Sequence, residues 1–141
     1  NSKMSWDSYI DNLIAHTKDG SGSANADKAC IIGLDGSKWT TDAPATAIKI
    51  TAAEAATIGK AFKSRDFSPF MSSGVTVEGI KYQFLREEDK LVLAKKKDLG
   101  ALTLQTSKTG VVIGHTKEGG QQGNTNKGVA TIAEYLESLN M

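Results

Sequence analysis

The chain has 141 residues, with 17 lysines and arginines, 16 aspartates and glutamates, 14 glycines, 2 prolines and 1 cysteine. This length suits one ordinary domain, and 39% hydrophobic with 23% charged residues is typical of a globular chain, which excludes disordered and fibrous classes. The formal net charge of +1 excludes a domain that grips nucleic acid through its overall charge. The single cysteine excludes a disulfide within the chain.

Targeting and membrane signals are missing from the pattern. No apolar run approaches the ~20 residues that a membrane helix needs, and the N-terminus lacks the basic-then-apolar order of a secretory signal. We therefore expect a soluble, cytoplasmic protein. We expect one domain over residues 4–141, with residues 1–3 as an extension or expression scar outside the fold.

The first periodic segment runs from Ser5 to Ala15, where apolar residues recur at helical spacing behind a possible Ser5 cap. The polar stretch over residues 16–27 predicts a long, mobile surface loop. An apolar run at 29–34, a turn at Asp35 and Gly36, and residues 38–41 together predict a β-hairpin.

The second helix is predicted from a capping box. Thr51 and Glu54 have the reciprocal spacing of this motif, and the alanine-rich stretch through Phe62 favours helix. Short strands separated by turns are then predicted at 75–77, 80–86, 91–97, 101–106 and 111–114. Because the connections are so short, these strands must form an antiparallel meander.

The last helix is predicted over residues 125–139, with Asn124, Thr125 or Asn126 as its cap and an apolar stripe along one face. The order of helices and strands predicts an α+β fold in which helices cover a central antiparallel sheet.

Catalytic and metal signals are weak throughout. Two histidines and one cysteine cannot complete a tetrahedral zinc site without carboxylates, and Cys30 lies in an apolar run where an inert thiol is the common state. The glycine-rich segment 119–128 departs from the phosphate-binding motif because Gly128 follows Lys127 where Ser or Thr is needed. We therefore predict no enzyme, no metal and no cofactor.

The aromatic residues are more informative. Trp6 and Tyr9 lie one turn apart on the first helix, and Tyr135 falls on one flank of the last helix's apolar stripe. If both helices pack on one sheet face, these rings and Trp39 could form a groove for a polyproline ligand, whose extended conformation costs little entropy to bind. Periodicity alone favours simple core packing over the groove.

The segment from Ser5 to Leu13 (SWDSYIDNL) resembles the amino-terminal helix of the profilins, small proteins that bind actin monomers. Similar segments follow in order at 29–33 with Trp39, at 74–82, at Arg86 and at 133–136, so the resemblance covers residues 4–141. It implies a sheet of six or seven antiparallel strands, with the terminal helices on one face and shorter helices on the other.

The resemblance also implies three binding sites. A groove between the terminal helices would bind proline-rich segments of actin-assembly factors through Trp6, Tyr9, Trp39, Tyr135 and Met141, where many family members end in Tyr. Actin contacts would come from Met71, Ser72, Lys81, Gln83, Arg86, Lys97, Gly123, Asn126 and Lys127. Phosphatidylinositol bisphosphate would bind Arg86, Lys95, Lys96 and Lys97, although a solvated surface explains any single lysine about equally well.

The implied function is that of a cytoplasmic, cytoskeleton-associated protein. It would bind monomeric actin, promote nucleotide exchange on actin, deliver monomers to growing filament ends and connect them with proline-rich partners. Two alternatives remain: a phosphoinositide-binding regulator with negligible actin affinity, and an adaptor for proline-rich peptides alone.

Overall fold

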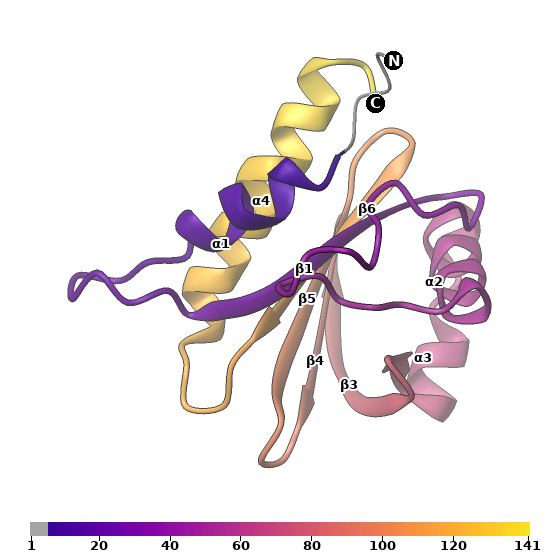
Figure 1. Ribbon diagram of the computed structural model, residues 1–141. Coiled ribbons are helices and arrows are strands. Elements are labelled where there is room, and N and C mark those ends of the chain that lie inside the picture. The colour runs from indigo at the N-terminus through magenta and orange to yellow at the C-terminus, as the bar shows by residue number, and fades with distance from the viewer. Residues whose placement is uncertain (1–5) are drawn as a thin grey trace.

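The computed structural model describes residues 6–141 and shows an α+β fold built on one antiparallel sheet (Figure 1). The sheet has six strands in the order β1-β6-β5-β4-β3-β2. The strands are β1 (Ala26–Gly33), β2 (Val75–Val77), β3 (Ile80–Glu88), β4 (Leu91–Lys96), β5 (Gly100–Thr106) and β6 (Gly110–Thr116). The helices are α1 (Ser8–Ala15), α2 (Ala52–Ser64), α3 (Ser68–Ser73) and α4 (Gln122–Ser138).

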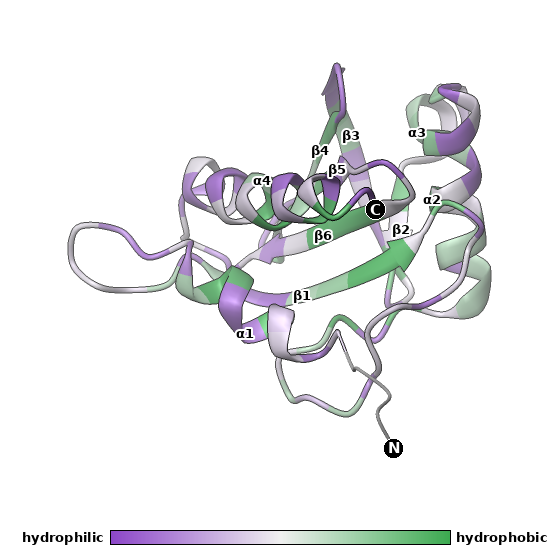
Figure 2. Ribbon diagram, turned by 90° about the horizontal axis from the view of Figure 1, so that it is seen from above, coloured by the Kyte–Doolittle hydropathy of each residue, from purple (hydrophilic) through white to green (hydrophobic). Residues whose placement is uncertain are grey.

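The helices form two layers on opposite faces of the sheet. The terminal helices α1 and α4 lie side by side on one face, whereas α2 and α3 lie on the other, as both views show (Figures 1 and 2). The chain leaves β1 at one edge of the sheet, passes through α2 and α3, and enters β2 at the opposite edge. This arrangement confirms the predicted fold, with six strands. Among residues 6–141, no helix is long and apolar enough to cross a membrane.

Each sheet face has its own apolar core, because successive side chains of a strand point to opposite faces. In β1, Cys30 and Ile32 pack with the α2 and α3 layer, while Ala29 and Ile31 pack with the α1 and α4 layer. Both faces of β1 and β6 are therefore buried, which explains the nearly continuous apolar runs in these two strands.

Two glycines allow the α1 and α4 layer to pack closely. A Cβ at Gly128 would lie 2.5 Å from Thr17 Cγ2 and 2.8 Å from the Leu13 carbonyl oxygen, so α4 approaches the end of α1 here. A Cβ at Gly114 would lie 2.8 Å from Val129 Cγ2, so β6 provides a shallow floor for α4. Together they set how closely the two terminal helices can lie.

The capping box of α2 is confirmed and has a second role. Thr51 Oγ1 accepts from the Glu54 amide, and Glu54 Oε1 accepts from the Thr51 amide. The same carboxylate accepts from the amides of Glu78 and Gly79 at 2.9 and 2.8 Å. Glu54 thus joins the start of α2 to the turn between β2 and β3.

The predicted hairpin after β1 is only partly formed. The turn at Asp35 is present, but the returning segment pairs with the strand only at Lys38, opposite Ile32. The Gly33 amide donates to the Ser37 carbonyl and the Trp39 amide to the Ile31 carbonyl, which makes this single bridge. Beyond it, the Thr40 amide also donates to the Ile31 carbonyl, and the Thr40 hydroxyl accepts from the Ile31 amide at 3.0 Å. A side chain thus replaces strand pairing at this edge.

The predicted loop over residues 16–27 is more ordered than its composition suggests. Thr17 and Asn25 are buried and hydrogen-bonded to each other, Lys18 pairs with Ala24, and β1 already begins at Ala26.

The N-caps of the two terminal helices are Asp7 for α1 and Gln121 for α4. The last helix begins at Gln122 with Gln121 at the N-cap, so none of the three predicted residues caps it. Asn25 anchors this start instead, since its Oδ1 accepts from the Gln121 amide at 2.9 Å. Ser5, the predicted cap of the first helix, lies outside the described residues; α1 has Asp7 at its N-cap.

Candidate functional site

Four aromatic side chains form a continuous row across the α1 and α4 layer. The ring centroids are 5.7 Å apart for Trp39 and Trp6, 5.1 Å for Trp6 and Tyr9, and 5.7 Å for Tyr9 and Tyr135. All three pairs are tilted by 32 to 41°. We call these four residues the aromatic row. The family resemblance implied that they lie together, and the structure brings them together.

Hydrogen bonds hold α1 against the segment that carries Trp39. The Asp7 carboxylate accepts from the Thr41 amide at 2.7 Å and from its hydroxyl at 2.6 Å. Asp11 accepts from the Thr46 hydroxyl at 2.9 Å. These contacts fix Trp6, one residue before Asp7, relative to Trp39.

Glycines provide the surface beneath Trp39. A Cβ at Gly110 would lie 3.0 Å from the six-membered ring of this indole, and a Cβ at Gly33 would lie 2.9 Å from its Nε1. Larger side chains at either position would displace the indole from the row.

Met141 also lies at this surface, packed against the core beneath the helices. Its carbonyl oxygen accepts from the hydroxyls of Ser107 at 3.0 Å and Thr109 at 2.8 Å, both in the turn between β5 and β6. Its amide donates to the Leu136 carbonyl at 2.9 Å. The backbone of Met141 is therefore fixed, and all five residues predicted for the proline-rich ligand belong to one region.

The aromatic row is neither fully buried nor freely exposed. Trp6, Tyr9 and Trp39 are half-buried, and Tyr135 is 43% exposed. The hydrogen bond with the neighbouring Tyr135 side chain, more than burial, raises the pKa of Tyr9, so the Tyr9 phenol keeps its proton at neutral pH. Flat rings with donors at one end suit a ligand that has apolar rings and free carbonyl groups.

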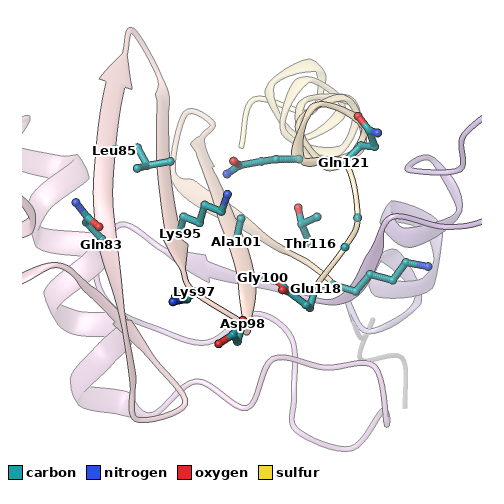
Figure 3. Close-up of a pocket in the computed structure, with 14 residues that line it drawn as sticks. Gln83, Leu85, Lys95, Lys97, Asp98, Gly100, Ala101, Thr116, Glu118 and Gln121 are labelled. Carbon is teal, nitrogen blue, oxygen red and sulfur yellow. The ribbon is translucent and has the colours of Figure 1, made fainter.

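A second surface lies where α4 and α3 leave the outer part of the sheet uncovered. A hollow of about 730 Å³ separates β3 and β4 from the segment before α4 (Figure 3). We call it the sheet hollow; Gln83 and Lys95 come from one side of it and Glu118 and Gln121 from the other. A second hollow, of about 500 Å³, lies between the same strands and α3, and we call it the α3 hollow.

The predicted actin-binding residues gather partly around these hollows. Gln83 and Lys97 line both of them, and Met71, Ser72 and Lys81 line the α3 hollow. Gly123, Asn126 and Lys127 lie in the first turns of α4, next to the sheet hollow but outside its lining; the Asn126 Oδ1 accepts from Thr103 Oγ1 at 2.5 Å. Arg86 lines neither hollow and pairs with Glu88 at 2.9 Å.

A β-bulge in β3 decides which side chains face this surface. Gln83 pairs with Lys95 and Arg86 pairs with Leu93, so the register shifts by one residue between Phe84 and Arg86. Without the bulge, Gln83 and Arg86 would point to opposite faces. The bulge also turns Leu85 outward, 47% exposed, into the lining of the sheet hollow.

Sequence reasoning missed Leu85, together with Gln121 and Glu118, as candidates at this surface. The strand pattern of β3 has no glycine or proline to mark the bulge, so the sequence offered no signal for Leu85. Gln121 and Glu118 lie in the glycine-rich segment that was noticed, but their proximity to β3 and β4 is a tertiary property.

Three of the four predicted phosphoinositide residues lie together, since Lys95, Lys96 and Lys97 all line the α3 hollow. Lys95 and Lys97 line both hollows, Lys96 lines only the α3 hollow, and Arg86 lies outside both. All three lysines are exposed, and within residues 6–141 none of the three has an ion pair.

The described part of the chain has no group of three or more His, Cys, Asp or Glu that could hold a metal ion. Cys30 is buried, and burial raises the pKa of its thiol, so it is not an activated nucleophile.

Comparison with known proteins places these features in a family. The profilin family model matches residues 4–141. Profilin of Heliocidaris crassispina is 70% identical over 140 residues, which cover 98% of this chain and all of that protein. The crystal structure of Acanthamoeba castellanii profilin II has a TM-score of 0.79 and 28% identity, covering 97% of this chain and all of the other.

Mouse profilin IIa has the same fold, with a TM-score of 0.71, 23% identity and coverage of 98% of this chain and all of the mouse chain; that structure is a complex with a double repeat from the FH1 domain of mDia1. The match over nearly the whole chain, at 70% identity to one relative, is far beyond what a shared fold alone produces. The chain belongs to the profilin family.

Proposed function

We propose that the chain binds proline-rich segments at the aromatic row and monomeric actin at the surface around the sheet and α3 hollows. It would thereby regulate actin polymerisation and nucleotide exchange on actin, in the cytoplasm and in association with the cytoskeleton. The observation that carries the proposal is the continuous row of four rings with centroids 5.1 to 5.7 Å apart.

Ligand chemistry supports the proline-rich partner. A polyproline helix is already extended, so binding it costs little conformational entropy, and its rings stack on indole and phenol faces. Its carbonyl groups are free to accept hydrogen bonds from the phenols of Tyr9 and Tyr135 and from the Trp indoles. The mouse family member in complex with an FH1 repeat supports the same class of partner.

The shape and chemistry of the second surface support a protein partner of larger size. Met71 and Leu85 are 64% and 47% exposed, and cationic and amide side chains surround them. Exposed apolar residues within a polar rim are typical of protein interfaces. Actin is the partner that family membership suggests for this surface.

Tryptophan fluorescence during titration with a proline decamer tests the first half of the proposal. Trp6 and Trp39 are the only indoles, and both belong to the row, so we expect a saturable change in emission. Tyr135→Ala removes an exposed ring without opening the core and should weaken binding about tenfold or more. Tyr135→Phe keeps the ring and serves as the matched control. Absence of any response up to millimolar peptide would contradict the groove.

Phosphoinositide binding is a second candidate, supported by the exposed and unpaired Lys95, Lys96 and Lys97. Such lysines attract anionic headgroups by about 1 kcal/mol each near a membrane surface. Co-sedimentation with vesicles that contain phosphatidylinositol bisphosphate, beside actin polymerisation assays, separates the candidates. Strong vesicle binding with no effect on actin would favour the lipid-binding regulator.

A further inference from the structure

A basic cavity lies beside the aromatic row, at the end of the molecule where four elements meet. Its volume is about 470 Å³, and its cations are Lys63 and Arg65 from the end of α2, Lys90 from the turn after β3, and Lys108 from the turn after β5. Leu34, Phe62 and the buried Thr106 also line it. These cations come from three segments that are far apart in the sequence, so no run of charged residues predicted the cavity.

Most of the positive charge in this cavity has no anionic partner. Lys90 pairs with Glu137 at 2.7 Å, but Arg65 donates only to the Asp89 carbonyl and Lys108 to the Asn140 side-chain oxygen. Lys63 has no ion pair or hydrogen bond within residues 6–141. Four cations against the single carboxylate of Glu137 leave a net charge of +3 in the lining.

The basic cavity adjoins a smaller hollow that includes one end of the aromatic row. This hollow, of about 340 Å³, is lined by Leu34, Asp35, Trp39, Lys63 and Thr109. Leu34 and Lys63 also line the basic cavity, so the two hollows share a wall. Trp39 is one end of the row, and a ligand that runs along the row and past this indole meets Lys63 first.

The carboxylates nearby neutralise only part of this charge. Asp35 lies in the smaller hollow, where Oδ1 accepts from the Ser37 amide at 3.0 Å and hydroxyl at 2.6 Å; these bonds, and to a smaller extent the charge of Lys63, lower the pKa of Asp35. Counted with the cavity, Asp35 reduces the net charge from +3 to +2. Asp89 adjoins Lys90, which already pairs with Glu137, and it does not line the cavity.

We propose that the basic cavity binds acidic residues that flank the proline-rich segment in a peptide ligand. This inference rests on the proposed function of the aromatic row and adds a determinant of partner choice to it. All ligands would place proline rings on the row. Only ligands with carboxylates just beyond Trp39 would also bind the cavity, so the protein would prefer them. The position of the cavity next to the row favours a peptide over a separate anionic ligand, because one chain can occupy both sites.

The test compares a proline decamer that carries a short run of glutamates with the same decamer carrying glutamines. The flank is placed after the prolines in one pair of peptides and before them in another, since a polyproline helix can run in either direction. Residues in this conformation advance by about 3 Å each, so a short run samples the distance from Trp39 to the cavity.

We expect the acidic flank, in one of the two positions, to tighten binding to the unmodified protein about three- to tenfold at low salt, and the preference to shrink when salt is raised. The double variant Lys63→Gln with Lys108→Gln should lose this preference and bind the glutamine peptide as the unmodified protein does. Lys49→Gln with Lys60→Gln removes the same charge from exposed positions outside the cavity and should keep the preference.

Three results would overturn the inference. Equal binding of acidic and neutral peptides would reject the acidic-flank site and leave the aromatic row intact. Binding of neither peptide would reject the row and the inference together. The third result combines two observations. If the unmodified protein shows no preference for the acidic flank, and the Lys63→Gln, Lys108→Gln variant no longer binds vesicles that contain phosphatidylinositol bisphosphate, the cavity is a site for a lipid headgroup instead.

Discussion

At the scale of single residues, His115 makes two polar contacts that link separate parts of the sheet. Its Nδ1 lies 2.5 Å from Asp27 Oδ1 on β1, and its Nε2 lies 2.7 Å from the Leu99 carbonyl oxygen in the turn after β4. Both partners are acceptors, and a neutral imidazole donates from only one nitrogen, so the two bonds together require the protonated ring. His115 thus ties the β1 edge to the turn beside the sheet hollow.

The ionisation of this pair follows from its partners. Burial lowers the pKa of His115, but the bonds to Asp27 and Leu99 outweigh burial and raise it above its usual value. For Asp27, burial has the opposite effect and raises the pKa, but the hydrogen bond to His115 outweighs burial, so the pKa of Asp27 is lowered. Lys28 slightly opposes the charge on the imidazole, and the Tyr82 ring packs edge-on at 6.0 Å.

The pH dependence of stability should reveal this contact. The raised pKa means that His115 stabilises the fold fully below its unfolded value of 6.5, and this contribution is lost as pH rises through the folded pKa. Asp27 stabilises above its unfolded value of 3.8, and its contribution is lost as pH falls through the folded pKa. The pair therefore stabilises the fold most between these two values.

We expect His115→Gln to lower the free energy of unfolding by about 1 kcal/mol at pH 6 and to flatten its decline between pH 6 and pH 8. Urea denaturation across this pH range measures both effects. His16→Gln is the matched control, because this exposed histidine bonds only to the Asn12 carbonyl of its own helix. An unchanged decline in the His115 variant would refute the assignment of a charged imidazole.

At the scale of elements, the spacing of α1 and α4 decides whether the aromatic row is continuous. Tyr9 is on α1 and Tyr135 is on α4, and their ring centroids are 5.7 Å apart. The glycine at position 128 lets the end of α1 lie against α4, since a Cβ there would meet Thr17 and the Leu13 carbonyl. Helix packing and ligand binding therefore depend on the same contact.

Gly128→Ala should lower the free energy of unfolding by about 1 to 3 kcal/mol through overpacking, and it should also weaken proline-decamer binding. Gly123→Ala is the matched control in the same helix, because a Cβ there meets nothing within 4 Å. We expect that variant to be as stable as the parent or slightly more so, since alanine favours helix. Equal stability of the two variants in urea denaturation would show that the helices can shift without cost.

At the scale of the whole molecule, the two proposed surfaces use different residues and different elements. The aromatic row draws on α1, α4 and the segment after β1, whereas the sheet and α3 hollows draw on α3, β3, β4 and the segment before α4. No residue of the row lines either hollow. The proposed function therefore predicts that two partners bind at the same time.

Separate variants should therefore separate the two activities. Trp6→Ala should weaken proline-decamer binding about tenfold or more, because buried aromatic anchors dominate such interfaces, and should leave actin binding unchanged. Arg86→Glu should weaken actin binding by reversing an exposed charge and leave the peptide unaffected. Trp39 emission during titration with the decamer measures peptide binding, and the rate of actin polymerisation measures actin binding. Equal loss of both activities in either folded variant would contradict independent surfaces.

The sequence by itself, together with the family resemblance, predicted the fold and most of the elements, although not α3. The capping box at Thr51 and the apolar runs of β1 and β6 are local signals, because propensity, capping and alternation act over a few residues. The family resemblance, which the segment around Trp6 and Tyr9 carries, also predicted that the aromatic residues lie together in one groove. The site residues that it implied remain predictions, although the structure brings most of them together.

Only the tertiary structure decided the features that depend on contacts between distant segments. The bulge at Leu85 changes which β3 side chains share a face, and neither glycine nor proline marks it in the sequence. Asn25, rather than a local cap, anchors the start of α4. Lys63 at the end of α2 and Lys108 in the turn after β5 both line the basic cavity, although they are 45 residues apart in the chain (108 − 63). Such features arise from register and packing between elements, which no local pattern encodes.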